Sequence, residues 1–441
     1  MHSRTLDIGH LLDEGRWSRP QKFFVFLTAL AIVFDGVDNQ LLGAALPALM
    51  REWSLGRGAF APALASGMIG MMIGGAIAGV VGDRVGRRLA LIGSVLVFGV
   101  LTLAAAFVDS VAALGVLRFL AGLGLGGAMP NAAALASEFV PWRHRPFAVT
   151  LTIVCVPLGG TLAALLAGQV LPVLGWRMLF MVGGLLPLAL AVLLWTALPE
   201  SPRYLVRDRA RWPELHRLLR RIGHPAPEHA EFADPAERSA ARASLPALFT
   251  PDLRGDTLAL WGAFFSCLLA VYTAFNWVPA MMTGAGLDLS VASNGLAAFN
   301  LGGVAGAILG GLVIARIGSR PTMLAMTAGA IAGCVGLASM SITAGAAHLP
   351  IIVMLGLTGG LINAVQTTMY ALATHVYPTS VRATGVGTAV AVGRSGGVLS
   401  TYTGAWALEA GGSSAFFGSI AAAMAIVFAC LASIVRHVPR R

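Results

Sequence analysis

Long apolar segments alternate with short polar ones along most of the chain. Each apolar segment is long enough to cross a bilayer as a helix, because about 20 apolar residues span its hydrocarbon core. We therefore predict an all-α membrane protein with twelve transmembrane helices. The predicted spans lie near residues 23–50, 60–82, 88–108, 111–137, 146–171, 175–198, 255–283, 290–314, 321–343, 349–374, 382–406 and 412–436.

The longest polar stretch, residues 199–254, leaves six predicted spans on each side. We therefore expect an N-terminal six-helix bundle (1–198), a cytoplasmic linker (199–254) and a C-terminal six-helix bundle (255–441). Within the linker, leucines and arginines between Trp212 and Ile222 recur at helical spacing and predict one short amphipathic helix.

The composition agrees with a membrane protein, since 57% of the 441 residues are hydrophobic and only 11% are charged. The net charge of +10 could suit nucleic acid, but basic residues in a membrane protein mark its cytoplasmic loops. With the N-terminus inside, most Lys and Arg residues fall on the cytoplasmic side, against only Arg51, Arg57 and Arg177 outside. We expect a monomeric, multi-pass inner-membrane protein with both termini cytoplasmic, embedded in the lipid bilayer, with no nucleic-acid partner.

The sequence predicts neither a metal site nor an enzyme. All four cysteines lie inside apolar segments, and no Cys/His pair has metal-ligand spacing. No HExxH, Walker A or G-x-S-x-G motif occurs in a fitting context. We therefore expect no cofactor, and no catalytic residues.

An internal repeat relates the two halves. The run GVVGDRVGRR at residues 79–88 joins spans two and three, and residues 311–320 join spans eight and nine with a similar run. Six-helix halves related in this way are typical of alternating-access carriers, whose binding site lies near the midplane. The repeat therefore predicts two pseudo-symmetric six-helix bundles that rock around a central site.

The loop at 79–88 has the features of a latch. Its glycines allow a tight turn, and Asp83 can cap a helix start or pair with an arginine across the cytoplasmic gap. The alternative is a basic loop that only sets topology, which leaves the acid and the glycine spacing unexplained. We predict gating contacts at Gly79, Asp83, Arg84, Gly86, Arg87, Arg88, Glu138, Arg145 and Arg382.

Two aspartates, Asp35 and Asp38, lie in the middle of the first apolar segment. A carboxylate at bilayer depth costs about 2.5–3.5 kcal/mol to insert, and residues three apart share one helical face. The nine histidines lie in loops or at span ends, and no lysine follows Lys22. We predict that one of the two aspartates carries a coupling proton and that Arg118 pairs with an aspartate when the proton leaves. The alternative is a pair of structural acids, with Arg118 as the partner of Asp38.

Several motifs resemble those of the major facilitator superfamily. The loop at 79–88 is similar to its G-x-x-x-D-R-x-G-R-R signature, and the run 118–127 is similar to its R-x-x-x-G-x-G motif. Residues 198–203 resemble the sequence that closes the sixth span of sugar-porter-like members. The resemblance implies the fold of that superfamily, with twelve helices in two pseudo-symmetric bundles.

A narrower resemblance covers most of the chain. The run Asp35-Gly-Val-Asp38 resembles the D-G-x-D motif of the aromatic acid:proton symporters, and the runs 122–131 and 377–387 resemble other parts of that family. This resemblance implies uptake of benzoate-like or hydroxybenzoate-like acids together with protons. Val37 departs from the family, which usually has an aromatic residue there, and Ala315 replaces the acid expected in the second-half loop.

Arg394 lies near the middle of the eleventh predicted span. Its planar guanidinium presents a fork suited to a carboxylate, so we predict that it binds the substrate carboxylate, directly or through the charge of the cavity. The alternative is a buried ion pair with a protein acid. An aromatic ring also needs an apolar slot with a few polar groups, for which the candidates are Phe34, Tyr272, Asn276, Trp277, Phe299, Asn300, Asn363, Gln366 and Tyr370.

Taken together, these features predict a proton-coupled symporter that imports an aromatic carboxylate such as benzoate or a hydroxybenzoate by alternating access. An alternative within the same class is a carrier of another organic acid or a sugar. From a different class, a non-transporting membrane sensor remains open, although such a protein usually carries a sizeable soluble domain.

Overall fold

The computed structural model describes residues 5–227, 230–234, 245–378 and 381–440. In this part of the chain, ten helices are long and apolar enough to cross a membrane. Two of them, α6 (Arg145–Ala197) and α14 (Arg382–Ser433), are interrupted by glycines with non-helical backbone angles, Gly175 in α6 and Gly411 with Gly412 in α14. Each of these two helices therefore contains two of the predicted spans, and all twelve predicted spans are confirmed.

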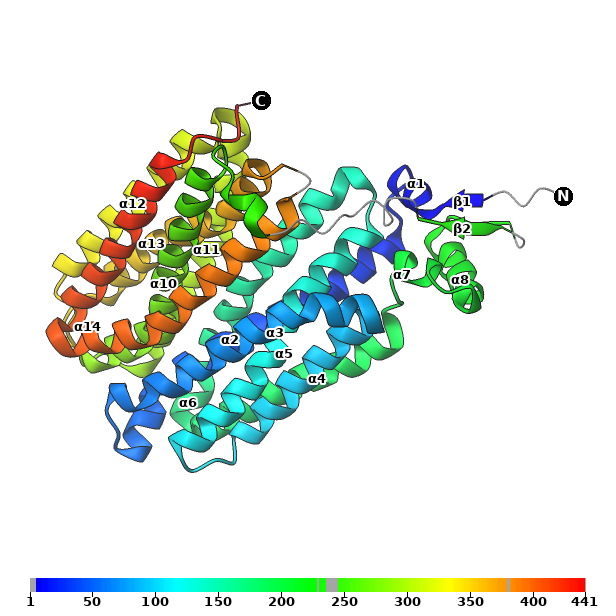
Figure 1. Cartoon of the computed structure of the whole chain (residues 1–441). Helices are drawn as coiled ribbons and strands as arrows, with labels where there is room; N and C mark the ends of the chain where they lie inside the picture. Colours follow the sequence, from blue (N-terminus) through cyan, green and yellow to red (C-terminus); the bar gives the residue numbers. More distant parts are fainter. Residues whose placement is uncertain (1–4, 228–229, 235–244, 379–380, 441) are drawn as a thin grey trace.

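The long helices form two bundles that lie side by side (Figure 1). The N-terminal bundle consists of both arms of α6 together with α2 (Arg19–Trp53), α3 (Arg57–Val85), α4 (Arg87–Ala105) and α5 (Val111–Phe139). The C-terminal bundle consists of both arms of α14 together with α10 (Arg254–Gly284), α11 (Leu289–Ile317), α12 (Ser319–Ser339) and α13 (His348–Val376). The predicted fold class, an all-helical membrane protein with two six-helix bundles, is confirmed.

Helices suit these segments because a helix pairs its own backbone groups, which the bilayer interior cannot hydrate. Small residues then let the helices approach one another closely. At Gly122 in α5, an added Cβ would lie 2.3 Å from the carbonyl oxygen of Gly67 in α3. Gly302 in α11 meets Gly356 in α13 in the same way, at 1.9 Å. Equivalent pairs of helices therefore pack through glycine in both bundles.

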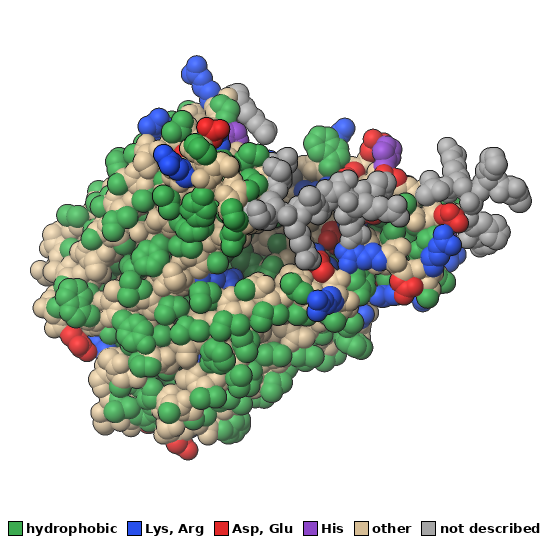
Figure 2. Space-filling model, viewed as in Figure 1, with side chains coloured by type: hydrophobic (Ala, Val, Ile, Leu, Met, Phe, Trp, Pro, Cys, Tyr) green, Lys and Arg blue, Asp and Glu red, His purple; other side chains and the backbone are tan. Residues whose placement is uncertain are grey.

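Three pairs of helices make most of the contacts between the bundles: α2 with α10, α3 with α14, and α6 with α11. We call the end of the molecule at which α2 begins and α6 ends the linker end, because the linker starts there. The opposite end, where α2 stops at Ser54, is called the far end. Both chain termini lie at the linker end (Figure 1). Charged side chains gather around this end, while the surface along the bundles is mostly hydrophobic (Figure 2).

A small subdomain covers the N-terminal bundle at the linker end. Strand β1 (Thr5–Asp7) pairs in parallel with β2 (Glu231–Ala233), so that the start of the chain and the linker form one two-stranded sheet. Helices α1 (Ile8–Asp13), α7 (Pro202–Val206) and α8 (Trp212–Ile222) complete it. The predicted amphipathic helix is confirmed as α8, whose buried face consists of Leu215, Leu218, Leu219 and Ile222.

Three short 3₁₀ helices complete the described elements. They span Trp142–His144, Arg209–Arg211 and Leu245–Phe249. The first lies directly before α6, and the other two belong to the linker.

Candidate substrate and proton site

The two aspartates of α2 have different surroundings, although both are buried. Asp38 is 1% exposed and accepts a hydrogen bond from Thr102 of α4. Its second carboxylate oxygen lies 3.3 Å from Nη1 of Arg118 in α5. Arg118 Nη2 donates to Thr102 Oγ1 at 2.7 Å, which closes a three-membered network. Asp38 is therefore held by an ion pair and a hydroxyl inside the N-terminal bundle.

Asp35, one helical turn earlier, has no such partner. Its side chain is 6% exposed, and its Oδ1 atom has no hydrogen-bond partner among the described residues. It lines a cavity at the boundary between the two bundles. Of the two acids, Asp35 is the one that lines the central cavity and has no ion-pair partner among the described residues.

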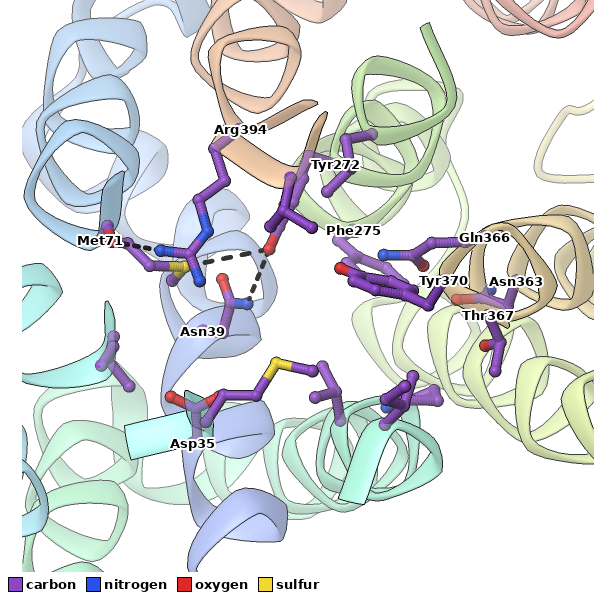
Figure 3. A pocket seen from close by; sticks show the side chains of 17 residues that line it. Asp35, Asn39, Met71, Tyr272, Phe275, Asn363, Gln366, Thr367, Tyr370 and Arg394 are labelled. Atoms are coloured by element: carbon purple, nitrogen blue, oxygen red, sulfur yellow. Dashed lines mark hydrogen bonds between the residues drawn. The ribbon is translucent and has the colours of Figure 1, made fainter. Parts of the chain in front are cut away.

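The cavity is lined by residues from seven of the long helices, α2, α3, α5, α6, α10, α13 and α14, and so from both bundles (Figure 3). Its apolar and aromatic wall surrounds a small number of polar groups, as is usual for small-molecule sites. The lining residues beside Asp35 are Asn39, Met71, Leu125, Met129, Ile153, Val156, Pro157, Leu268, Tyr272, Phe275, Asn363, Gln366, Thr367, Tyr370, Val390 and Arg394.

Arg394 brings the positive charge of the C-terminal bundle to this cavity. Its Nη1 donates to the backbone carbonyl of Met71 in α3, a contact between the bundles. No described carboxylate forms an ion pair with it. The guanidinium therefore keeps donors for a ligand. Beside it, Asn39 donates to the Tyr272 hydroxyl at 3.4 Å, so α2 and α10 also meet at this wall (Figure 3).

A second pocket adjoins the cavity through Asn39, Met71 and Leu125, which line both. It contains Asp38, Arg118 and Asn276. Asn276 is 1% exposed, and neither its amide oxygen nor its amide nitrogen has a described partner. The predicted substrate residue Asn276 therefore lies in this second pocket rather than in the central cavity.

Comparison with known proteins identifies the group to which this architecture belongs. Residues 28–401 match the family model described as the Major Facilitator Superfamily. The chain belongs to the Major Facilitator Superfamily. The members of this superfamily are transporters rather than enzymes.

Two relatives within the superfamily are similar over nearly their whole length. A protein described as a gallate transporter, from Pseudomonas putida, is 33% identical over 92% of this chain and 90% of its own. The 4-hydroxybenzoate transporter PcaK from the same organism is 34% identical over 92% of this chain and 91% of its own. Among solved structures, an inward-open conformation of the xylose transporter XylE from E. coli has a TM-score of 0.73. It is 17% identical, with 95% of this chain and 97% of that one covered.

The signature loop of the superfamily lies between α3 and α4 at the linker end. Gly86 has φ 102°, and an added Cβ would lie 2.2 Å from Oε2 of Glu200, so only glycine fits there. Asp83 pairs with Arg87 at 2.6 Å, within its own loop and not across the gap between the bundles. Arg87 Nε also lies 3.9 Å from Glu138. In this conformation the predicted latch contacts of Asp83 stay inside the N-terminal bundle.

Glu200, just after α6, connects the linker to this loop. Its Oε1 accepts from the backbone N–H groups of Arg88 at 3.1 Å and Ser201 at 2.9 Å, which places an anion at the start of α4. Burial raises the pKa of the Glu200 carboxyl, and the two backbone hydrogen bonds oppose that effect. Ser201 in turn donates to Glu138. The run 198–203 therefore has a structural task, which is to anchor the linker against α4 and α5.

The other predicted gating residues are dispersed around the linker end. Arg145 pairs with Asp13 of the N-terminal segment and donates from Nε to the Ser137 carbonyl at 3.1 Å. Arg382 donates from Nε to the Tyr377 carbonyl at 3.3 Å. Arg84 is exposed, and an added Cβ at Gly79 would meet nothing within 4 Å.

The structure brings some of the predicted substrate residues together and leaves others apart. Arg394, Asn363, Gln366 and Tyr370 all line the central cavity. Trp277 is fully buried against Gly404 of α14 and lines neither pocket, and Phe34 is half-buried in the apolar packing nearby.

Sequence reasoning missed Thr367, Asn39 and Phe275 as lining residues. A signal for Thr367 was available, because residues 363, 366, 367 and 370 have the spacing of a single helical face.

Proposed function

We propose that this protein is a proton-coupled symporter that imports an aromatic carboxylate, such as benzoate or a hydroxybenzoate, across the inner membrane by alternating access. One observation carries the proposal. A single cavity between the bundles holds a buried carboxylate without a partner, Asp35, and an arginine without an acidic partner, Arg394. The gallate and 4-hydroxybenzoate transporters similar to this chain support the class of substrate.

The two charged groups suggest how binding and protonation are coupled. Arg394 offers a carboxylate a charge-assisted, bidentate site. While Asp35 is ionised, its negative charge in the same cavity disfavours a second anion. A proton on Asp35 removes that repulsion, so the acid and the proton enter together. After release of both toward the cytoplasm, the ionised Asp35 again balances Arg394, and the carrier can return.

Contacts between the bundles point to the state represented here. Gln40 and Asn300 exchange two hydrogen bonds across α2 and α11, at 2.9 and 2.7 Å, and both side chains are fully buried. Gln40 lies beyond Asp35 toward the far end of α2. An added Cβ at Gly43 would lie 2.9 Å from Cα of Asn276, so α2 and α10 also touch there. We infer that this amide pair, together with the α2–α10 contact, closes the far side in an inward-facing state.

The remaining assignments follow from this state. The linker end, which holds most basic residues and both termini, faces the cytoplasm. Residues 1–198 and 255–441 then move as two bodies, and residues 199–254 connect them. The loop at 79–88 and its partners Glu138, Arg145 and Arg382 would regroup when the cytoplasmic side closes. The carrier works as a monomer in the bilayer, since one chain contributes both walls of the cavity.

A sugar carrier is the main competing assignment within the superfamily. The chemistry of the cavity favours an anion, because a guanidinium without an acidic partner is better matched to a carboxylate than to neutral hydroxyl groups. Proteoliposomes with an imposed pH gradient, acidic outside, test the difference. We expect saturable uptake of labelled benzoate or 4-hydroxybenzoate and none of xylose. Saturable xylose uptake without aromatic acid uptake would reassign the substrate.

Arg394 provides the sharper test of the carboxylate site. We expect Arg394→Gln to raise the KM for an aromatic acid about 100-fold, since a buried charge-assisted contact is worth about 3 kcal/mol. Arg316→Gln, which removes an exposed arginine at the end of α11, is the matched control and should leave the KM unchanged. An Arg394→Gln carrier with the parent KM would remove Arg394 from the binding site.

A further inference from the structure

One face of α13 lines the central cavity with four side chains at helical spacing. Asn363, Gln366, Thr367 and Tyr370 occupy positions i, i+3, i+4 and i+7. All four carry amide or hydroxyl groups, and Tyr370 also contributes an aromatic ring, in a cavity whose other polar groups lie mainly on α2 and α14. We call Asn363, Gln366 and Thr367 the polar face of α13.

This polar face lies apart from Arg394. Figure 3 shows Arg394, Asn39 and Met71 on one side of the pocket and Gln366, Asn363 and Thr367 on the other. The aromatic side chains of Phe275 and Tyr370 lie between the two groups (Figure 3). A flat ring in the pocket, with its carboxylate at Arg394, therefore directs its opposite edge toward α13.

The hydrogen-bonding groups on this face are available to a ligand. Gln366 and Thr367 are half-buried, and neither side chain has a hydrogen bond to any described residue. Asn363, 2% exposed, uses its amide nitrogen to donate to the Gly359 carbonyl at 2.9 Å, which leaves its amide oxygen as an acceptor.

Thr367 departs from the pattern of other threonines in these helices. Thr368, its neighbour, donates its hydroxyl to the Ala364 carbonyl at 2.7 Å, one turn back in the same helix. Thr322 and Thr327 make the same kind of bond at 2.7 Å each. Such bonds satisfy a hydroxyl within its own helix. The Thr367 hydroxyl lacks this bond and lines the cavity, so it is free to pair with a substrate group.

We propose that the polar face of α13 binds hydroxyl groups on the substrate ring, so that the carrier selects aromatic acids hydroxylated meta or para to the carboxylate. This inference rests on the proposed function. Phenolic hydroxyls both donate and accept, and amide and hydroxyl side chains do the same. A ring without a hydroxyl leaves Gln366 and Thr367 unpaired once water is expelled, which disfavours it. A hydroxyl ortho to the carboxylate lies beside Arg394 and cannot reach α13.

Uptake kinetics of four acids in proteoliposomes test the proposal. The acids are benzoate and 2-, 3- and 4-hydroxybenzoate, and the readout is the ratio of each KM to that of benzoate. For the parent protein we expect the KM for 4-hydroxybenzoate to be about tenfold below those of benzoate and 2-hydroxybenzoate, the gain typical of one or two neutral hydrogen bonds. The value for 3-hydroxybenzoate should also lie below that of benzoate.

Variants then assign the discrimination to α13. Thr367→Val and Gln366→Leu should each reduce the benzoate to 4-hydroxybenzoate ratio by a factor of about three to ten. Thr368→Val removes a hydroxyl from the adjacent position that does not line the cavity and should keep the parent ratio. Saturable benzoate uptake by each variant shows that it is folded.

The possible failures are distinguishable. Equal KM values for benzoate and 4-hydroxybenzoate in the parent protein overturn the hydroxyl site and leave the proposed function intact. The same holds if Thr367→Val and Gln366→Leu both retain the parent ratio. Absence of saturable uptake of all four acids by the parent overturns the proposed function itself, and the hydroxyl site with it.

Discussion

At the scale of single residues, the main result is that two aspartates one turn apart have opposite surroundings. Asp38 is held by Arg118 and Thr102 inside the N-terminal bundle, whereas Asp35 faces the cavity without a partner. The sequence indicated that at least one acid was functional, because both lie at bilayer depth. It did not separate them, because Thr102 and Arg118 reach Asp38 only through the packing of α2, α4 and α5.

This difference predicts opposite effects on stability. Asp38→Asn leaves the Arg118 charge buried, at 5% exposure, without its acid, and losing one partner of a buried pair typically costs about 3 kcal/mol or more. Asp35→Asn breaks no ion pair and removes a buried ionisable group. We expect thermal unfolding of the purified protein to show a Tm well below the parent for Asp38→Asn and a Tm at or above it for Asp35→Asn. Equal losses would contradict the assignment of Asp38 as the structural acid.

At the scale of elements, long helices were predictable from the sequence and short pairings were not. Apolar runs locate the spans, and the chain turns at Gly175 and Gly412, the first residues of the predicted spans 175–198 and 412–436. The sheet formed by β1 and β2 was missed, because three-residue strands lie more than 200 residues apart and carry no periodic signal. The ion pair of Asp83 with Arg87 in its own loop was not predictable either, because the partner of Asp83 depends on the conformational state.

The amide pair formed by Gln40 of α2 and Asn300 of α11 leads to a prediction at this scale. Gln40→Leu leaves Asn300 buried without its partner, so it should weaken the closure of the far side. Ala280→Cys, placed in a pocket between the bundles at the far end, reports on that closure in a background without other cysteines. We expect a membrane-impermeant maleimide to label this cysteine several-fold faster in the Gln40→Leu background.

A matched double variant controls for unrelated effects of the leucine. Gln40→Leu with Asn300→Leu replaces both partners by apolar groups and should recover part of the slow labelling. Identical labelling rates in all three backgrounds would show that the pair does not hold the far side closed.

A second prediction at this scale concerns pH and the C-terminal tail, residues 434–440 beyond α14. The tail docks on the start of α12, where the backbone N–H of Ser319 donates to the Val438 carbonyl at 2.9 Å. His437, just beyond α14, lies 3.1 Å from the Ser319 hydroxyl and 3.2 Å from the Leu431 carbonyl. A carbonyl can only accept, so Nε2 donates to Leu431, and the Ser319 hydroxyl can donate to Nδ1 of a neutral imidazole. Burial lowers the pKa of His437 below its ordinary value of 6.5, with Arg320 acting in the same direction and Asp256 opposing it. The docked tail therefore resists protonation.

Because the pKa of His437 is lowered in the docked tail, docking of the tail should weaken as the pH falls. The stabilisation of the docked tail is present above pH 6.5 and is lost as the pH falls through the lowered value, because the released tail then takes up a proton more readily. A spin label at Arg440→Cys should be immobile at pH 7.5 and mobile near pH 5. His437→Gln should remove this pH dependence. An immobile label at both pH values in the parent would contradict the prediction.

At the scale of the whole molecule, two bundles each supply half of the site. The N-terminal bundle contributes Asp35 and the C-terminal bundle contributes Arg394 and the polar face of α13. The internal repeat made the two bundles predictable, and mid-span charge singled out Asp35 and Arg394, which both line the cavity. Trp277 was chosen for its residue type, but its ring packs against Gly404 because α10 turns that face toward α14. Which side of a span faces the cavity depends on how the bundles dock.

The central claim is that Asp35 couples the proton to the acid. Proteoliposomes containing Asp35→Asn should exchange labelled 4-hydroxybenzoate for unlabelled acid, yet fail to accumulate it under an imposed pH gradient. Asp288→Asn, an exposed acid at the far end, is the matched control and should accumulate it as the parent does. Accumulation at the parent level by Asp35→Asn under the same gradient would contradict the account.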